Sequence, residues 1–432
     1  MTPVEDERPA SMLATAVRRI ARHPLAQIGP GLITGVADDD PSGIATYSQA
    51  GAQFGLNMLW TLPLTYPLMA AVQSMCGRLG RVTGKGLAAN IKAQFPPWVL
   101  FAVVSLLVIA NTLNIAADVA AMGESAELVS GWNRHVLTLV FAGVTLGLQV
   151  LAPYHRYVVF LKWLTLALLS YVAVLFTVRV PWGEVLTRTL LPHIKFDATS
   201  ATVVIAIFGT TISPYLFFWQ ASEEVEDLSA GRAALTADPA SAPGELRRIR
   251  WDTWSGMFYS NITAYFIVLA TAVTLHVNGV VDIQTAGQAA SALRPLAGEF
   301  TFFLFAIGIL GVGLIGVPVL AGSSGYAVAE ALGWSEGLER KAKDARGFYA
   351  VIAAGVLIGV GLEYAPINPM KALFWSAVIN GVVAVPLVVI VVLLSRRSSV
   401  MGPFTASWSL AALGWITALL MAAASVGMLA LS

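Results

Sequence analysis

The stretch ITGVADDDPSGIATYSQAG, residues 33–51, decides the fold because it places Asp38, Asp39 and Asp40 directly before Pro41 within an apolar run. An ionisable side chain at the centre of a bilayer costs about 3 kcal/mol on insertion scales, so it marks a functional position by default. Proline has no N–H group and kinks or ends a helix. The stretch therefore predicts a membrane helix that breaks at Pro41 and carries functional carboxylates at the break.

The composition of the whole chain indicates an integral membrane protein. Of its 432 residues, 57% are hydrophobic and only 12% are charged, which is far more apolar than a soluble domain. A helix needs about 20 apolar residues to cross the hydrocarbon core of a bilayer. We expect an all-α protein with eleven transmembrane helices. They lie near residues 26–54, 57–77, 98–129, 134–152, 156–178, 200–221, 252–276, 299–322, 346–363, 370–395 and 407–430.

The distribution of basic residues predicts the orientation. With the N-terminus in the cytoplasm, 20 of the 26 lysines and arginines fall on the cytoplasmic side, as the positive-inside rule requires. We expect a multi-pass protein of a bacterial-type inner or plasma membrane. A net charge of +1 gives no excess of positive charge that would bind nucleic acid, so we expect no nucleic-acid partner. The apolar composition makes the lipid bilayer the expected partner.

A second break is predicted in the sixth helix, in FGTTISPYLFFWQ, residues 208–220. Proline leaves the carbonyl four residues earlier without its helical hydrogen bond, so Pro41 frees the carbonyl of Ala37 and Pro214 frees that of Thr210. Free backbone groups at membrane depth must face protein or a water-filled cavity. Interruptions at matching positions of two halves point to a transporter binding site.

Breaks in helices one and six are what two five-helix repeats would give, with an eleventh helix outside them. The hydrophilic stretch 222–250 is expected to be a cytoplasmic linker. The predicted divisions are a cytoplasmic segment at 1–25, repeats at 26–180 and 181–399, and the last helix at 400–432.

Asp40 is the strongest candidate for an ion ligand. Its carboxylate and the free carbonyls of Ala37 and Thr210 would form an oxygen cluster, which suits a hard divalent cation. Alternatively, Asp40 only caps the helix that begins at the following proline. Asp38 and Asp39 either line the approach to the ion or pair with polar neighbours. The chain has no phosphate-binding loop, HExxH or nucleophile elbow, so we expect neither an enzyme nor a cofactor.

Three motifs resemble the NRAMP family of divalent-metal transporters. The stretch GPGLITGVADDDPSGIATYSQAGAQFG, residues 29–55, is similar to the first helix of that family, whose motif is Asp-Pro-Gly-Asn. GTTISPYLFFWQAS at 209–222 resembles the sixth helix, which carries Met-Pro-His, and NIAADVAAMG at 114–123 resembles the third. The resemblance implies a LeuT-type fold with 5+5 inverted repeats, and transport of Mn²⁺ and Fe²⁺ together with protons.

The departures from the family motifs concern the ion ligands. The resemblance keeps Asp40 as a ligand, with the carbonyls of Ala37 and Thr210, but the family's Asn falls on Gly43 and its Met on Ser213. A thioether favours transition metals, whereas oxygen ligands suit Mg²⁺, which tends to retain its waters. The closest likeness is therefore to the NRAMP-related magnesium transporters, which implies Mg²⁺ as cargo with Mn²⁺ tolerated. Alternatively, Gly43 and Ser213 are residues of close helix packing.

The resemblance also suggests that proton coupling is weak or lost. It places the family's helix-three Asp at Asp118, but two acidic companions fall on Asn111 and Ala121, and the helix-six histidines fall on Tyr215 and Gln220. Histidine is the side chain best suited to carry protons near neutral pH. The candidate pathway residues beside the ligands are Asp38, Asp39, Asp118, Tyr215, Gln220 and Asn380.

Two further observations leave alternatives open. The acidic run after helix six either draws cations by its field or is a solvated helix end; it consists of Glu223, Glu224, Glu226 and Asp227. Asn261 and Asn380 are expected to hydrogen-bond between helices. The first rival function is a proton-coupled Mn²⁺ or Fe²⁺ importer. A remote rival is an organic-solute carrier, although three aspartates oppose a carboxylate substrate.

Overall fold

The structure, a computed structural model, describes residues 30–151, 164–192, 197–229, 234–364 and 368–431. Within these ranges every regular element is a helix, which confirms the predicted all-α class. The predicted cytoplasmic segment 1–25 and the start of the fifth predicted helix lie outside the described residues.

The long helices follow the predicted apolar stretches closely, with ends that differ by several residues. They are α2 (Pro30–Asp38), α3 (Pro41–Phe54), α4 (Thr61–Thr83), α6 (Pro97–Ser130), α7 (Arg134–Leu151), α11 (Ala198–Thr211), α12 (Pro214–Ser229), α13 (Ala242–Thr274), α16 (Thr301–Leu332), α17 (Arg346–Glu363), α18 (Pro369–Arg396) and α20 (Trp408–Leu431). Shorter helices are α5 (Leu87–Gln94), α9 (Leu169–Val174), α10 (Trp182–Leu190), α14 (Ala286–Ala290), α15 (Arg294–Ala297) and α19 (Ser398–Met401).

Both predicted breaks are present. The first helix stops at Asp38 and restarts at Pro41, and the sixth stops at Thr211 and restarts at Pro214. Each proline occupies the first helical position after its break, where a missing N–H costs nothing because that group has no helical partner. The backbone chemistry of two prolines therefore divides each of these helices into two.

The number of membrane spans is supported only in part. Among the described residues, seven helical segments are long and apolar enough to cross a bilayer, and α17 is a shorter apolar helix. The count of eleven stays a prediction. The predicted linker at 222–250 is wrong, because α12 continues to Ser229 and α13 begins at Ala242, so most of that stretch is helix. Three of its charged residues, Glu224, Glu245 and Arg248, form ion pairs within and between helices.

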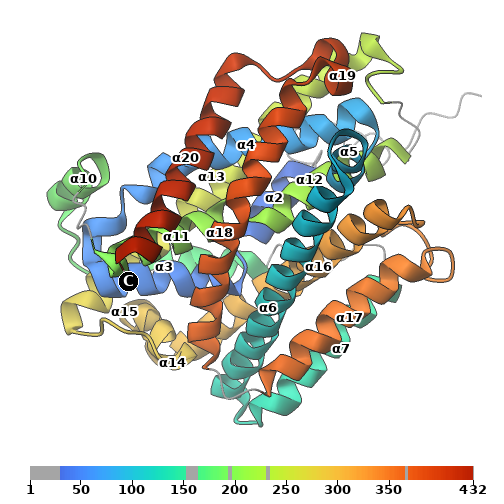
Figure 1. The fold of residues 1–432 in the computed structure, drawn as a ribbon. Helices are drawn as coiled ribbons and strands as arrows, with labels where there is room; N and C mark the ends of the chain where they lie inside the picture. The colour runs from blue at the N-terminus through green and yellow to red at the C-terminus, as the bar shows by residue number, and fades with distance from the viewer. Residues whose placement is uncertain (1–29, 152–163, 193–196, 230–233, 365–367, 432) are drawn as a thin grey trace, which may run out of the picture.

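The broken first helix lies inside the bundle. α3 is contacted by α6, α11, α13, α16 and α18, while α6, α7 and α17 pack together along one edge (Figure 1). Small residues allow the close approaches, as is common between membrane helices. A Cβ atom added to Gly35 would lie 2.2 Å from the carbonyl oxygen of Gly256 on α13, and one added to Gly209 would lie 2.0 Å from that of Ala377 on α18.

We predict that Gly209→Ala lowers the stability of the protein by about 1–3 kcal/mol, because the added methyl group forces α11 away from α18. The measurement is the thermal unfolding midpoint of the purified protein in detergent. The matched control is Gly147→Ala on α7, where a Cβ atom would meet nothing within 4 Å and alanine favours the helix. Equal midpoints for the two variants would contradict the proposed contact.

Candidate functional site

The two helix breaks lie against each other. A Cβ atom added to Gly43, in the first turn of α3, would lie 3.1 Å from Thr210 Oγ1 at the end of α11 and 3.4 Å from the carbonyl oxygen of Asp38. Contacts this short are tighter than most side chains make, so a glycine favours the approach of the two breaks. This geometry agrees with the alternative that Gly43 is a residue of close helix packing. The same approach brings the predicted ligands of helix one and helix six into one region.

Asp40 lies where three elements meet, with 1% of its surface exposed. Its Oδ1 accepts hydrogen bonds from Ser42 Oγ at 2.6 Å and from the amide of Gly43 at 2.8 Å. Its Oδ2 accepts from Asn114 Nδ2 of α6 at 2.9 Å and from Tyr215 Oη of α12 at 3.3 Å. Asp40 is thus the N-cap of α3, and its other oxygen contacts α6 and α12. Its role as a helix cap is therefore compatible with the predicted role as an ion ligand.

The freed carbonyl groups are each satisfied by a hydroxyl group. The single hydroxyl hydrogen of Tyr215 is shared between the carbonyl oxygen of Ala37, at 3.0 Å, and Asp40 Oδ2. Ser213 Oγ lies 2.9 Å from the carbonyl oxygens of both Gly209 and Thr210. Ser213 therefore faces its own helix end in this structure, and its oxygen retains lone pairs that could bind a cation. Buried carbonyls need such partners because no bulk water reaches them.

The two helix-six candidates, Tyr215 and Gln220, have different surroundings. Tyr215 contacts Asp40 and Ala37 directly. Gln220 lies further along α12, where its Oε1 accepts a hydrogen bond from Thr34 of α2 at 2.7 Å. The structure therefore brings Tyr215 to the predicted ligands and assigns Gln220 to the contact between α12 and α2.

Asp38 and Asp39 face α13. Ser260 Oγ lies 2.6 Å from Asp38 Oδ2 and 3.1 Å from Asp39 Oδ1, so both carboxylates share one hydroxyl group. Among the described residues, no three or more His, Cys, Asp or Glu side chains are arranged to hold a metal ion. The three consecutive aspartates therefore do not converge as a group on one ion, and of the three, Asp40 is the one hydrogen-bonded to α6 and α12.

Sequence reasoning missed two residues at this site, Asn114 and Ser260. Asn114 was detectable, since an amide four residues before Asp118 occupies the same face of an apolar helix. Ser260 carries no signal of its own, because serine is common between membrane helices. Asp118 is fully buried near the start of α3, within electrostatic range of Asp40.

The membrane amides differ from one another. Asn261 Nδ2 lies 3.1 Å from Thr65 Oγ1 of α4, which confirms the expected hydrogen bond between helices. Asn111 donates to three acceptors on α16. Asn380 is buried, and neither of its side-chain polar atoms has a hydrogen-bond partner among the described residues. The expected interhelical bond is thus absent for Asn380 in the part of the chain described.

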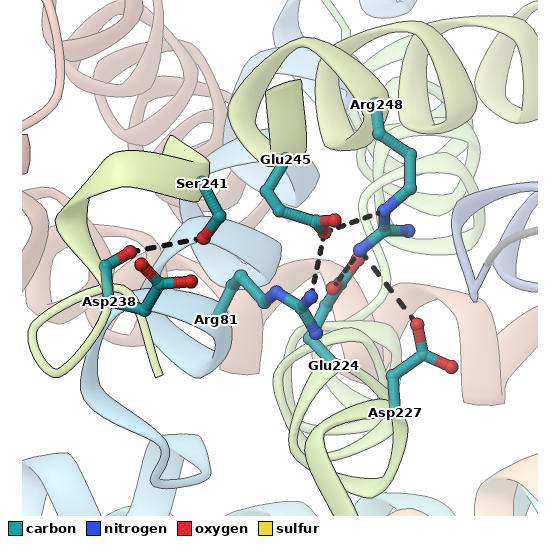
Figure 2. Close-up of polar contacts among 7 residues, drawn as sticks. All are labelled: Arg81, Glu224, Asp227, Asp238, Ser241, Glu245 and Arg248. Carbon is teal, nitrogen blue, oxygen red and sulfur yellow. Dashed lines mark hydrogen bonds and ion pairs between the residues drawn. The ribbon is translucent and has the colours of Figure 1, made fainter. Parts of the chain in front are cut away.

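The acidic run at the end of helix six joins helices together. Arg248 Nη2 of α13 lies 2.5 Å from Glu224 Oε2, and Arg248 Nε lies 3.1 Å from Glu245 Oε2 (Figure 2). Glu245 also pairs with Arg81 of α4 at 2.8 Å. Glu226 accepts a hydrogen bond from Tyr326 of α16 at 2.7 Å. A solvated helix end is wrong for Glu224, which is fully buried and paired, whereas Glu226 is part-buried and bonded to α16. The field of the run stays a prediction.

Comparisons with known proteins agree with this arrangement. Residues 31–431 match the family model described as natural resistance-associated macrophage protein-like, Nramp. The chain is 27% identical over 403 residues to the divalent metal cation transporter MntH of Acidiphilium cryptum, covering 88% of this chain and 84% of that protein. It is 29% identical over 390 residues to MntH of Verminephrobacter eiseniae, covering 83% and 82%.

Solved structures share the fold at low sequence identity. A manganese transporter of Eremococcus coleocola, in complex with an aromatic bis-isothiourea compound, matches with a TM-score of 0.72 and 16% identity over 98% of this chain and 88% of that one. MhsT in complex with L-phenylalanine matches with a TM-score of 0.66 and 12% identity over 93% and 98%.

The solved structures show the LeuT-type fold, as predicted, and the family model over residues 31–431 defines a multi-pass membrane transporter. The chain belongs to the Nramp family, because the family model covers nearly its whole length. This match confirms the resemblance to the NRAMP family that the three motifs indicated. Members of this family are transporters and not enzymes.

We predict that Arg248→Met lowers stability by about 2–3 kcal/mol, because it leaves the fully buried Glu224 without its partner while Arg248 itself is 25% exposed. The double variant Arg248→Met/Glu224→Met removes both charges and is expected to recover most of the loss. Denaturant or thermal unfolding of the parent, Arg248→Met, Glu224→Met and the double variant measures the coupling free energy between the two side chains. A single variant as stable as the parent would refute the importance of the pair.

We also predict that protonation of Glu336, in the connection after α16, makes stability depend on pH. Burial and the nearby Glu330 and Glu226 raise the pKa of Glu336 to about 8 from its ordinary value of 4.5, against the opposing effect of Arg340. The folded protein holds this proton more tightly than the unfolded chain, so the contribution of Glu336 to stability is lost as pH rises from about 4.5 to 8.

Glu336→Gln keeps this position neutral at every pH. We expect the variant to be more stable than the parent at pH 9, with a difference that shrinks toward pH 4, measured by thermal unfolding across that range. A difference that does not change with pH would show that Glu336 does not titrate in this way.

Proposed function

We propose that this protein transports divalent metal cations across the membrane by alternating access, with Asp40 at the centre of the binding site. The preferred cation is Mg²⁺, Mn²⁺ is tolerated, and proton coupling is weak or absent. The observation that supports this most directly concerns the Asp40 carboxylate. It shares the Tyr215 hydroxyl with the carbonyl of Ala37 and accepts a hydrogen bond from Gly43, which lies against Thr210.

The donor set supports a hard cation. The groups gathered at the breaks are a carboxylate, backbone carbonyls and hydroxyls, and the hydrogen-bond partners of Asp40 include neither sulfur nor imidazole. Oxygen ligands favour Mg²⁺ and Mn²⁺ over softer metals. In this structure the hydroxyl groups of Tyr215 and Ser213 donate hydrogen bonds to the carbonyl oxygens of Ala37 and Thr210. A cation bound to these carbonyl oxygens would replace the hydrogen bonds.

A proton-coupled Mn²⁺ importer is the second candidate. The similar proteins from Acidiphilium cryptum and Verminephrobacter eiseniae are called divalent metal cation transporters, and the solved neighbour from Eremococcus coleocola is a manganese transporter. In this candidate Asp118, Asp38 or Asp39 would carry the proton, because all three are buried carboxylates near the break. Measurement of proton flux separates the two functions.

The location and orientation belong to the same proposal. A bacterial-type inner membrane with a cytoplasmic N-terminus accounts for the excess of basic residues on one side of the chain. In that orientation the network of Arg248, Glu224 and Arg81 lies at the cytoplasmic side, and the two five-helix repeats divide near residue 180.

Uptake into liposomes by the purified protein tests the proposal, with separate dyes for Mg²⁺, Mn²⁺ and internal pH. We expect uptake of both ions without obligatory acidification, and a loss of at least about tenfold for both in Asp40→Ala. Ser213→Met adds a thioether and is expected to shift the preference toward Mn²⁺. Full transport by Asp40→Ala would rule out the proposed site, and Mn²⁺ uptake that requires acidification, without Mg²⁺ uptake, would favour the second candidate.

A further inference from the structure

A cavity lined by three arginines lies where α4, α13 and α20 meet. α4 packs against both α13 and α20 (Figure 1), and the cavity between the three helices has a volume of about 360 Å³. Ligand cavities are typically about 300–1,000 Å³. The polar side chains in its wall are Ser74 and Arg78 of α4 and Arg247 and Arg250 of α13, and Leu246 and Leu410 add apolar surface.

The positive charge of this cavity is not neutralised by the described residues. None of the side chains in its wall is acidic, and its three arginines take part in none of the described ion pairs. The neighbouring carboxylates of α13 are bonded elsewhere. Glu245 pairs with Arg81 and Arg248, and Asp252 accepts a hydrogen bond from the backbone amide of Gly31. The charge of the cavity therefore suits an anion.

Two buried donor groups in the wall of the cavity lack acceptors. Ser74 is 2% exposed, and its hydroxyl group has no hydrogen-bond partner among the described residues, although a helical serine can bond to the carbonyl four residues earlier. Arg78 Nη2 donates to the carbonyl oxygens of Phe404 and Thr405, before α20. Arg78 Nε is buried and has no acceptor in the part of the chain described. Buried donors without acceptors are unfavourable, so both groups indicate a ligand that accepts hydrogen bonds.

The face of α13 that carries Arg250 continues with aromatic side chains. Trp254 and Phe258 follow Arg250 at spacings of four residues, which places all three on one side of the helix. The ring of Tyr66 on α4 contacts both aromatic rings, with centroids 5.6 and 5.7 Å apart. Phe258 is 54% exposed and Trp251 is 66% exposed, as expected for aromatic side chains near the end of a membrane helix. The arginine-lined cavity therefore adjoins an apolar surface.

We propose that this cavity binds the phosphate group of an anionic phospholipid. The three arginines and Ser74 donate hydrogen bonds to the phosphate oxygens, which the planar guanidinium group matches well. The acyl chains lie along the aromatic face of α13. Basic pockets between membrane helices on the cytoplasmic side recognise anionic headgroups, and in the orientation proposed above this end of α13 faces the cytoplasmic leaflet. The site is independent of which ion the protein transports.

A lipid titration of the purified full-length protein in detergent tests the site, with the thermal unfolding midpoint as the measurement. We expect phosphatidylglycerol to raise the midpoint. Phosphatidylcholine, whose own cation offsets the phosphate charge, is expected to raise it much less. Glycerol 3-phosphate has the phosphate group without acyl chains and is expected to have no effect at the same concentration. Equal stabilisation by glycerol 3-phosphate would identify a soluble ligand and overturn the lipid assignment, and equal stabilisation by phosphatidylcholine would overturn the charge recognition.

Arg247→Gln/Arg250→Gln tests the charge of the cavity. Both side chains are exposed and lie outside the described ion pairs, so we expect the variant to fold. Each arginine near an anionic lipid is worth about fivefold in affinity, so the phosphatidylglycerol concentration for half-maximal stabilisation is expected to rise about 30-fold. Ser74→Ala is expected to raise it about three- to tenfold, as for the loss of one hydrogen bond.

Lys343→Gln/Arg346→Gln is the matched control. It removes two positive charges from exposed side chains that the proposed orientation also places on the cytoplasmic side, and neither residue belongs to the cavity. We expect its response to phosphatidylglycerol to equal that of the parent. A control that weakens the response as much as Arg247→Gln/Arg250→Gln would show an effect of overall charge, and the inference would fail. It would fail equally if Arg247→Gln/Arg250→Gln and Ser74→Ala kept the parent's response, and the proposed transport function would be untouched.

Discussion

The structure depends on satisfying backbone carbonyls that two prolines deprive of their helical partners. In a soluble protein, water would complete these hydrogen bonds, but inside a bilayer the protein must provide the donors. The hydroxyl of Tyr215 reaches the carbonyl of Ala37 in helix one, and that of Ser213 reaches the carbonyls at the end of α11. Tyr215 belongs to the break of helix six and bonds to helix one, so the two breaks must lie together. The small residue Gly43 between them allows this approach.

The features that depend on local chemistry could be predicted from the sequence. The breaks at Pro41 and Pro214 follow from the missing N–H group, and the long helices follow from runs of apolar residues. Asp40 could be identified as both cap and candidate ligand because each role depends on its position beside Pro41. The resemblance of three motifs to one family supplied the fold, which the comparisons then confirmed.

The remaining features depend on how helices are rotated and which neighbours they meet. Asn114 contacts Asp40, and Ser260 joins Asp38 to Asp39, only because α6 and α13 pack against the first break. The stretch 222–250 looked like a linker because it is hydrophilic and rich in Ala, Ser, Gly and Pro. The charges of Glu224, Glu245 and Arg248 are instead paired within and between helices, a property that no single-segment pattern contains.

The ion pairs around Arg248 have a mechanical consequence for helix six. Glu224 fixes α12 to α13, and Glu245 fixes α13 to α4 through Arg81. The bonds between Ser222 and Glu330 and between Glu226 and Tyr326 instead attach α12 to α16. A tilt of α12 that preserves the ion pairs would move α12, α13 and α4 together. It would have to break the two bonds to α16 and the bonds of Tyr215 and Gln220 to the first helix.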